Sequence, residues 1–405
     1  MAQRQGPILV ALDAGNSKIR VLVAEMQEGA VRYKAHAEVE ARGMRRGVVA
    51  DLGPAANALN EAFKAAEAAS GCMISSAVVG MGGPHVHGFS SRGGILLGNR
   101  MREITREDIR AAVDRARSVE LPVDRSTLHL LPQEFFIDEQ GGVHDPVGMV
   151  GNSLEVNLLM VTCLTGAMQS FVTCMNRTGV EAIDTVFEAL AAAEAVLSAD
   201  ERELGACVLD IGAASTELVV LFQGAVVHAA SLPIGGDHFT NDLAVVLRTS
   251  LAEAEHLKCQ FGHSVVTAVS QVHEVDVQGK DASTARRVPL RYLSEILEPR
   301  ARELFQMVRD NLRQGGVLEA LGTGSVLVGG GAKLAGLPDH AEGILRVPSR
   351  VGLPVRFSRM PDALMDPEFA TLVGLLLYSH RVQQYRGEQD AGLRAKLRAI
   401  VGGKV

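Results

Sequence analysis

Two short turns carry side chains suited to phosphate chemistry. The first runs from Asp13 to Lys18 (DAGNSK) and the second from Asp210 to Thr216 (DIGAAST). Each lies between two apolar runs, which predicts a strand, a tight turn and a second strand. Turn N–H groups and hydroxyls bind phosphate oxygens, and carboxylates hold hydrated Mg²⁺. The pair therefore predicts a phosphate site in which Asp13 and Asp210 hold Mg²⁺ through water, although either Asp-x-Gly by itself is also typical of an ordinary turn.

A third glycine motif, Gly329-Gly330-Gly331, follows the apolar run Ser325 to Val328. Glycine backbone can lie close to a flat ligand such as an adenine ring because no Cβ intervenes. Many strand-to-helix turns also contain glycine, so this motif has weight only beside the two aspartate turns. Asp13 and Asp210 are much further apart than one solenoid repeat. Their separation indicates a duplicated domain, with two like lobes that close on the phosphate chain from opposite sides.

The composition limits the class of protein. The chain has 405 residues, 47% of them hydrophobic, which is enough for two lobes with their own cores. A net charge of −7 and the absence of Trp argue against a nucleic-acid partner. The five cysteines show no CxxC or CxxH spacing, and the histidines between positions 85 and 144 fit no standard ligand set. We therefore expect reduced thiols rather than a cysteine or histidine metal site.

The N-terminal residues do not look like a targeting segment. Met1 to Gly6 are polar and lack the apolar core of a signal peptide. No apolar run approaches the ~18–20 residues that a membrane-spanning helix needs. We therefore expect a protein that is made in the cytosol and stays there.

Alternating strand and helix patterns predict an α/β protein. Helices are expected at 52–70 and at 292–312, the second broken or kinked at Pro299, and residues 264–278 are expected to be strand-rich. Thr105 and Asp108 form a variant of the capping box and predict a helix that runs to about Val119. A further helix is expected at 251–261, with Glu255 and Lys258 three positions apart on one face. The last core helix is expected at 369–382, followed by a polar linker from Gln383 to Asp390. The expected division is a first lobe (1–84 and 166–197), an inserted subdomain (85–165), a second lobe (198–236 and 300–382), a further subdomain (237–299), and a linker with a C-terminal segment (383–405).

The C-terminal segment has the pattern of a basic amphipathic helix. At ~100° per residue its apolar side chains share one face and its basic side chains flank that face. Such a helix suits an anionic lipid surface. A short terminal helix that docks on its own protein, or frays, remains the alternative. The residues concerned are Leu393, Leu397, Ile400 and Val401 on the apolar face, and Arg394, Lys396 and Arg398 beside it.

The order of these motifs resembles the actin-like ATPase superfamily and, within it, the FtsA family of bacterial cell-division proteins. The resemblance runs from about Leu9 to Tyr378. It is most specific in four stretches: Ile104 to Asp108, Leu131 to Phe135, Asp145 to Met149, and Asp200 to Gly205. It implies an actin-like two-lobe fold of duplicated ribonuclease-H-like domains. The segment 85–165 would be the FtsA-type inserted subdomain of the first lobe.

The resemblance also implies a function. Members of this family bind ATP and Mg²⁺, polymerise on the cytoplasmic face of the inner membrane at the division site, and attach through a C-terminal amphipathic helix. The subdomain after Gly236 receives the FtsZ C-terminal tail, and the inserted subdomain contacts later division proteins. ATP hydrolysis would be slow or absent. Two alternatives remain: an actin-fold ATPase with a chaperone-like lobe-closing cycle, and a pilus-assembly relative that does not polymerise.

The family's nucleotide-binding residues can be carried over by motif. Phosphates would lie between the two turns, the sugar beside the Gly-Gly turn, and the base against the triple glycine. The implied residues are Gly15, Asn16, Ser17 and Lys18 in the first turn; Gly212, Ala213, Ala214 and Ser215 in the second; Gly235 and Gly236; Glu255 and Lys258 beside the adenosine; and Gly329, Gly330 and Gly331.

This chain departs from the family pattern at both turns. The family usually has glycine where this chain has Ala213 and Ala214, and threonine where it has Asn16. If either alanine position needs a positive φ, alanine there costs about 1 kcal/mol, and nucleotide affinity should fall several-fold.

Four further residues each allow two interpretations, one functional and one structural. Glu188 could orient the attacking water, as a carboxylate does in chaperone relatives, or could be an N-terminal helix charge. Arg286, Arg300 and Glu303 lie in the region that resembles the FtsZ contact, but exposed helix charges are common without a partner.

Overall fold

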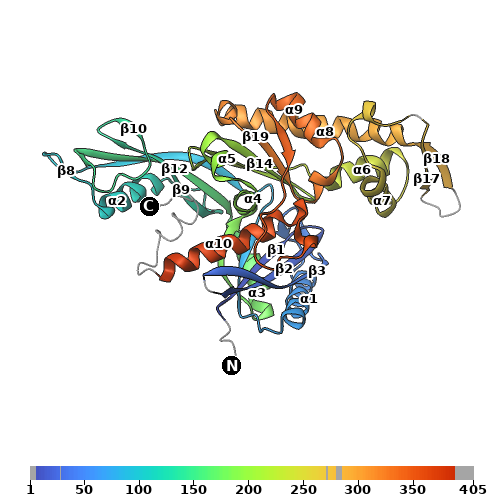
Figure 1. Cartoon of the computed structure of the whole chain (residues 1–405), viewed down its shortest axis with the longest axis horizontal. Coiled ribbons are helices and arrows are strands. Elements are labelled where there is room, and N and C mark those ends of the chain that lie inside the picture. Colours follow the sequence, from blue (N-terminus) through green and yellow to red (C-terminus); the bar gives the residue numbers. More distant parts are fainter. Residues whose placement is uncertain (1–5, 28, 271, 280–284, 388–405) are drawn as a thin grey trace.

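A computed structural model describes residues 6–387 except 28, 271 and 280–284. The molecule is elongated, with a central body and an arm on either side (Figure 1). A five-stranded and a nine-stranded sheet account for most of the strands described. The inserted subdomain forms one arm, and α6, α7, β17 and β18 form the other.

The first sheet has the strand order β13-β6-β1-β2-β3. Its strands are β1 (Ile8–Ala14), β2 (Lys18–Gln27), β3 (Ala30–Glu40), β6 (Ser76–Met81) and β13 (Glu181–Phe187). Helix α1 (Leu52–Ser70) matches the prediction, and α3 (Thr165–Thr178) lies beside it. Asp51 caps the start of α1 through the Gly53 N–H, and Gly71 ends it with a φ of 68°. Local capping residues therefore set both ends of this helix.

The second sheet joins the second lobe to the inserted subdomain. Its order is β10-β9-β12-β7-β16-β15-β14-β19-β20. The second lobe supplies β14 (Ala206–Ile211), β15 (Thr216–Phe222), β16 (Ala225–Leu232), β19 (Gly324–Val328) and β20 (Ser349–Val351). The inserted subdomain supplies β7 (His87–Leu96), β9 (Arg125–Ile137), β10 (Gln140–Val143) and β12 (Ser153–Leu164).

The junction between β7 and β16 is narrow. Among the described residues, the two strands pair antiparallel at one position, where Ala230 lies opposite His87. Gln133 adds a hydrogen bond from its Nε2 to the Val227 carbonyl at 2.8 Å. The inserted subdomain interrupts the chain of the first lobe, yet its sheet continues that of the second lobe.

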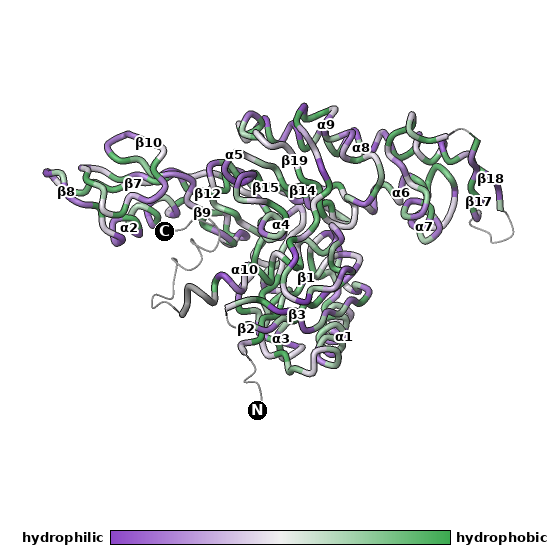
Figure 2. Tube along the Cα trace, viewed as in Figure 1, coloured by the Kyte–Doolittle hydropathy of each residue, from purple (hydrophilic) through white to green (hydrophobic). Residues whose placement is uncertain are grey.

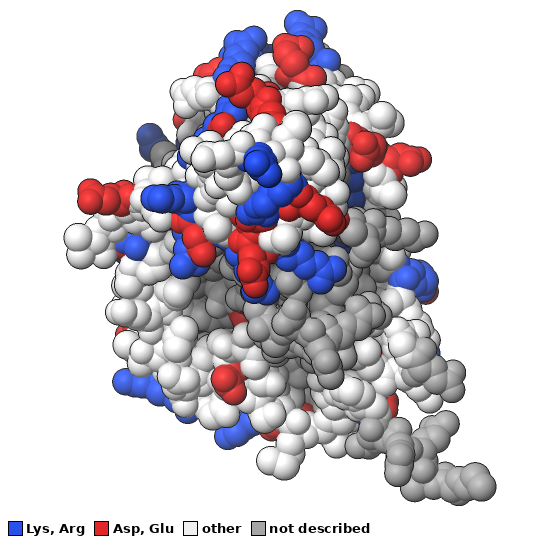
Figure 3. Space-filling view, turned by 90° about the vertical axis from the view of Figure 1, so that its left-hand side faces the viewer, with Lys and Arg blue, Asp and Glu red and all other residues white. Residues whose placement is uncertain are grey.

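The inserted subdomain has its own core behind helix α2 (Arg106–Arg117). The predicted capping box is confirmed: the Thr105 hydroxyl accepts from the Asp108 N–H, and the Asp108 carboxylate accepts from the Thr105 N–H at 2.8 Å. Arg102 forms a fork with the same carboxylate, and its nitrogens lie 2.8 and 2.6 Å from the two oxygens. Small strands β8 (Arg102–Glu103) and β11 (Val150–Gly151) pair at the tip. Figure 3 looks onto this end, where acidic and basic side chains are intermixed.

The opposite arm corrects two expectations. Residues 264–278 contain one strand, β17 (Glu274–Gln278), and a short 3₁₀ turn at Val266–Ala268, so the segment is less strand-rich than predicted. Helix α8 (Leu290–Gln314) runs through Pro299 without a break, and a kink there stays a prediction. Its buried stripe from Leu293 to Leu312 packs into the second core and holds the helix across the missing N–H.

The other elements of this arm are α6 (Gly236–Val246), α7 (Leu251–Phe261) and β18 (Ala285–Pro289). The first lobe also contains β4 (Met44–Arg45) and β5 (Val48–Val49), and the second lobe contains α5 (Ala199–Leu204) and α9 (Leu337–Leu345).

Two helices cross at the centre of the molecule. Helix α4 (Glu188–Val196) packs against α10 (Ala370–Gly387), and both bury side chains in the largest core cluster. Gly374 permits the contact, because a Cβ there would lie 1.8 Å from the Ala191 carbonyl oxygen. Helix α10 continues to Gly387, so the linker predicted from Gln383 is wrong over its first residues. The hydropathy colouring shows hydrophobic segments along the central strands (Figure 2). Among the described residues, we find no helix with the length and apolar character needed to cross a bilayer.

Replacement of Gly374 by alanine should separate α4 from α10. The added Cβ would meet backbone rather than a flexible side chain, so we expect a loss of at least about 2 kcal/mol in the free energy of unfolding. Urea unfolding of the two proteins measures the difference. Gly343→Ala in α9 is the matched control, because a Cβ there meets open space and should stabilise the helix by about 0.5–1 kcal/mol. Equal stability of the Gly374→Ala protein and the parent would contradict the packing argument.

Candidate functional site

The two predicted hairpins have the same local geometry. In the first, the Gly15 N–H donates to the Lys18 carbonyl at 3.0 Å. In the second, the Gly212 N–H donates to the Ser215 carbonyl at 2.9 Å. Both aspartates stand at the same place in their strands, one residue before the end of the ladder. The turns are thus built alike, as the duplication hypothesis requires.

Both turns border one cavity. Its lining includes Gly15 and Asn16 from the first turn, Ser215 from the second, and Glu188 at the start of α4. The Gly80 to Gly83 segment closes one side, and a Cβ at Gly82 would lie 2.0 Å from a Glu188 carboxylate oxygen. The structure therefore brings residues of the two sequence motifs, and Glu188, to a shared space.

Ser17 and Lys18 stand apart from this cavity. Ser17 is exposed, and the Lys18 Nζ pairs with Glu38 at 2.6 Å. Asn16 accepts a hydrogen bond from the Gly47 N–H at 3.2 Å, so its amide helps hold the loop that covers the cavity.

Ala213 and Ala214 adopt no positive φ. The conformational cost considered for these positions is therefore absent from this structure. The Gly-Gly turn packs directly behind them: the Gly236 N–H donates to the Gly212 carbonyl at 2.9 Å, and the Asp237 N–H donates to the Ala213 carbonyl at 2.7 Å. A Cβ at Gly235 would lie 2.6 Å from the Ala213 oxygen, so only glycine fits this close approach.

Glu255 and Lys258 lie beside the same Gly-Gly turn. The Lys258 Nζ contacts Glu255 at 2.7 Å, donates to the Thr240 hydroxyl at 2.8 Å and donates to the Gly236 carbonyl at 3.1 Å. Thr240 also donates to Glu255. The pair predicted on one helix face thus fastens α7 to the start of α6.

The triple glycine lies behind the second turn rather than in the cavity lining. Gly329 has a φ of 81°, and a Cβ there would come within 2.3 Å of an Asp210 carboxylate oxygen. Gly331 packs on Ile211 in the same way, with a Cβ position 2.4 Å from the Ile211 side chain. Gly330 faces open space. Its position leaves room for a group laid against the backbone.

Glu188, which lines the cavity, lies close enough to Asp13, Asp210 and Glu217 for their charges to raise its pKa, and sequence reasoning missed one of these groups, Glu217. Asp13, Asp210 and Glu217 are all more than nine-tenths buried. Glu217 accepts hydrogen bonds from the Gly83 N–H at 2.7 Å and the Ser215 hydroxyl at 2.7 Å. The signal for it was available, because Glu217 stands directly opposite Asp210 in the hairpin register.

Burial raises the pKa values of these four groups, and repulsion by neighbouring carboxylates adds to the effect in Asp13, Glu217 and Glu188. Desolvation, opposed in part by Arg20, raises the pKa of Asp13 to about 6. Desolvation and the charge of Asp210 raise the pKa of Glu217 to about 7. Burial also raises the pKa of Asp210, despite the hydrogen bond that Thr371 donates to it, and holds the pKa of Glu188 well above its ordinary value. Clustered buried carboxyls with raised pKa values are typical of a functional site.

The donor set fits a hydrated Mg²⁺ ion. Among the described residues, no three His, Cys, Asp or Glu side chains are arranged to hold an ion by themselves. Mg²⁺ usually keeps several waters and takes one or two carboxylates with phosphate oxygens. Asp13 and Asp210 each supply buried carboxylate oxygens, one from each hairpin. The two groups lie near enough that the charge of Asp210 raises the pKa of Asp13. They would hold such an ion, whose positive charge would relieve their repulsion.

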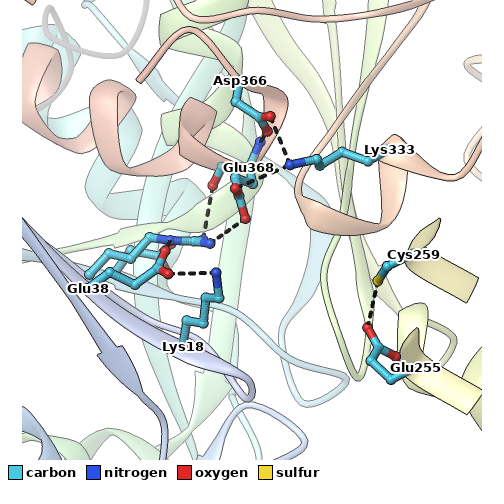
Figure 4. Close-up of polar contacts among 9 residues, drawn as sticks. Lys18, Glu38, Glu255, Cys259, Lys333, Asp366 and Glu368 are labelled. Carbon is cyan, nitrogen blue, oxygen red and sulfur yellow. Dashed lines mark hydrogen bonds and ion pairs between the residues drawn. The ribbon is translucent and has the colours of Figure 1, made fainter. Parts of the chain in front are cut away.

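An ion-pair network links the first turn to the triple glycine. Arg20 pairs with Glu38 at 2.7 Å and with Glu368 at 2.6 Å, and Lys333 reaches Glu368 at 3.3 Å. Figure 4 shows Lys18 and Glu38 on one side of this network and Lys333 with Asp366 on the other. Arg20 and Lys333 thus hold Glu368 between the two lobes.

The residues implied in the FtsZ contact are engaged within the arm. Arg300 forms a fork with Asp242, at 2.7 and 2.9 Å, and contacts Glu303 at 2.5 Å. The Arg286 guanidinium donates to the Leu247 carbonyl at 2.6 Å. Arg300 and Glu303 share a face of α8, whereas Arg286 lies on β18. The membrane segment from Leu393 to Val401 lies outside the described residues.

Glu188→Gln should stabilise the protein at neutral pH. A carboxyl whose pKa is raised by folding destabilises the native state as the pH rises above its unfolded value of 4.5, and the amide removes this penalty. We expect a gain of about 1–2 kcal/mol near pH 7 that vanishes toward pH 4. Urea unfolding across this range measures it, with exposed Glu203→Gln in α5 as the control. A variant less stable than the parent throughout would show that the Glu188 charge is compensated.

Comparison with known proteins identifies the family. The family model described as "Cell division protein FtsA" matches residues 207–374, and that of the "SHS2 domain inserted in FTSA" matches residues 83–162. Curated proteins named "Cell division protein FtsA" include one from Pseudomonas aeruginosa, 35% identical over 94% of this chain and 91% of that protein. The one from Escherichia coli is 31% identical over 96% of this chain and 93% of its own length.

Solved structures agree on the fold. The "PilM-PilN type IV pilus biogenesis complex" matches with a TM-score of 0.66 and 18% identity, over 92% of this chain and 98% of that one. MreB5 of Spiroplasma citri bound to ADP matches with a TM-score of 0.56 and 14% identity, over 95% and 99%. Because the sequence identity to these structures is low, they establish only that this chain has the actin-like fold. The identity to cell-division proteins decides the family, and it disfavours the pilus-assembly alternative. The chain belongs to the FtsA family of actin-like cell-division proteins.

Proposed function

We propose that this chain is an ATP-binding scaffold of bacterial cell division. It would bind ATP with Mg²⁺, polymerise on the cytoplasmic face of the inner membrane at the division site, and tether FtsZ filaments there. The observation that carries the nucleotide part is the pair of Asp-x-Gly hairpins opening on one cavity. Structures of the same fold are described as bound to ADP and AMPPNP, which supports the same class of ligand here.

The proposed nucleotide lies across the two turns. Its phosphates contact the backbone of Gly15 and Asn16 and of Gly212 to Ser215, and its base lies against Gly330. Turn N–H groups and the Asp13–Asp210 pair, through Mg²⁺, supply the positive partners that a phosphate chain needs. Glu188 borders the cavity and would orient a water molecule. A single orienting carboxyl without a strong base is compatible with slow hydrolysis.

Gly330→Leu tests the nucleotide site. A Cβ at Gly330 meets no protein atom, so the variant should fold, yet its side chain would fill the space proposed for the base. We expect at least a tenfold loss of ATP affinity, about 1.4 kcal/mol, in equilibrium binding of a fluorescent ATP analogue. Gly343→Leu in α9 also points into open space and should bind like the parent. Unchanged affinity of the Gly330→Leu protein would remove the base from this position.

The assembly part of the proposal uses three further surfaces. The arm after Gly236, with Arg286, Arg300 and Glu303, would receive the FtsZ C-terminal tail. The inserted subdomain would contact later division proteins, and its exposed apolar side chains Leu96, Met101 and Val150 are suited to such contacts. The C-terminal segment would bind anionic lipid.

A vesicle experiment separates these roles. The full chain should carry a labelled FtsZ-tail peptide to vesicles that contain anionic lipid. A chain ending at residue 390 should bind the peptide in solution but leave the vesicles bare. Arg300→Glu should bind vesicles and lose peptide binding about tenfold, because it reverses the charge beside Asp242 and Glu303. Arg302→Glu, two positions further along α8 and paired with Glu298, is the control. Vesicle binding by both chain lengths alike would remove the role of the tail.

A further inference from the structure

Arg20 is a buried cation beside Asp13. Its side chain is 11% exposed, and its Nη1 lies 4.0 Å from an Asp13 carboxylate oxygen. The guanidinium also pairs with Glu38 and Glu368, donates to the Glu368 carbonyl at 3.1 Å, and lies 4.9 Å from the centre of the Phe369 ring. With this many partners the group is fixed in position.

The hairpin register explains why Arg20 lies beside Asp13. Asp13 and Arg20 are directly opposed in the β1–β2 ladder, and Asp210 and Glu217 are opposed at the same position of the β14–β15 ladder. Opposed residues on antiparallel strands have their side chains on the same face. The two hairpins therefore differ in charge. Arg20 lies opposite Asp13 in the first lobe, whereas a second carboxylate, Glu217, lies opposite Asp210 in the second lobe.

Other cations near the site are held at its edge. Lys18 and Lys333 have side chains that are 42% and 46% exposed, and both form ion pairs. Lys258 is more buried and pairs with Glu255 on the far side of the Gly-Gly turn. Arg20 thus differs from these three lysines, because it is both buried and next to a carboxylate proposed to hold Mg²⁺. A charge in a desolvated site acts more strongly than one at the surface.

We infer that Arg20 supplies part of the positive charge that the divalent ion would otherwise have to supply beside Asp13, so that loss of Arg20 makes nucleotide binding more dependent on Mg²⁺. The inference rests on the proposed nucleotide binding. Removal of the guanidinium would leave Asp13 without its cation, whereas Glu38 would keep Lys18 and Glu368 would keep Lys333. A triphosphate would then meet the uncompensated Asp13 carboxylate unless Mg²⁺ neutralised it. The ratio of ATP affinity with Mg²⁺ to affinity in EDTA is therefore the quantity that Arg20 sets.

The test measures this ratio by equilibrium binding of a fluorescent ATP analogue. Arg20→Gln keeps hydrogen-bonding capacity without the charge, and Arg20→Met serves as a second neutral variant. We expect the ratio to rise about tenfold in both, mainly through weaker binding in EDTA. Arg20→Lys restores the charge and should return the ratio toward that of the parent. Arg202→Met removes another buried guanidinium, 3.3 Å from Glu194 in α4, and controls for lost stability, which thermal unfolding monitors.

The outcomes separate the inference from the proposed function. An unchanged ratio in a folded neutral variant overturns the role of Arg20. A ratio that rises equally in Arg20→Lys, or in Arg202→Met, also overturns it, because the charge beside Asp13 would not be the cause. Absence of binding by the parent protein under both conditions contradicts the nucleotide proposal itself.

Discussion

The structure depends on burying acidic side chains at a place where two like hairpins meet. Asp13 and Asp210 stand near the ends of their strands, Glu217 lies opposite Asp210, and Glu188 begins α4. Each of these groups has a raised pKa, so their close approach opposes folding. Such an arrangement persists when a cation or ligand compensates it, and when the surrounding packing is strong enough to hold it.

The packing that holds it comes from close backbone contacts between elements far apart in the chain. Gly374 lets α10 lie on Ala191 of α4, and Gly329 lets the strand-to-helix turn lie on Asp210. Arg20 and Lys333 then bind Glu368 from the two sides. Small residues and ion pairs therefore fix the lobes at the same place where the carboxylates repel one another.

The inserted subdomain shares in this arrangement. It begins just after Gly83, whose N–H donates to Glu217, and Arg125 of β9 donates to the His85 carbonyl at 2.8 Å. The subdomain also contacts the second lobe: His87 of β7 lies opposite Ala230 of β16, and Gln133 of β9 donates to the Val227 carbonyl. The subdomain therefore contacts the cavity wall and both lobes, although its own core is separate.

The sequence by itself determined the local elements: the hairpins with their Asp-x-Gly turns, helix α1 between Asp51 and Gly71, and the Thr105–Asp108 capping box. These follow from period, turn chemistry and caps, which depend on near neighbours in the chain. The tertiary structure decided which of the signalled residues share a cavity, placing Asn16 and Ser215 there and Ser17 outside it. It also gave Glu217 and Arg20 their roles, because each acquires its charge environment from strands and loops that are distant in sequence. The path of α8 through Pro299 was decided in the same way, since burial against the second core outweighs the local signal to stop.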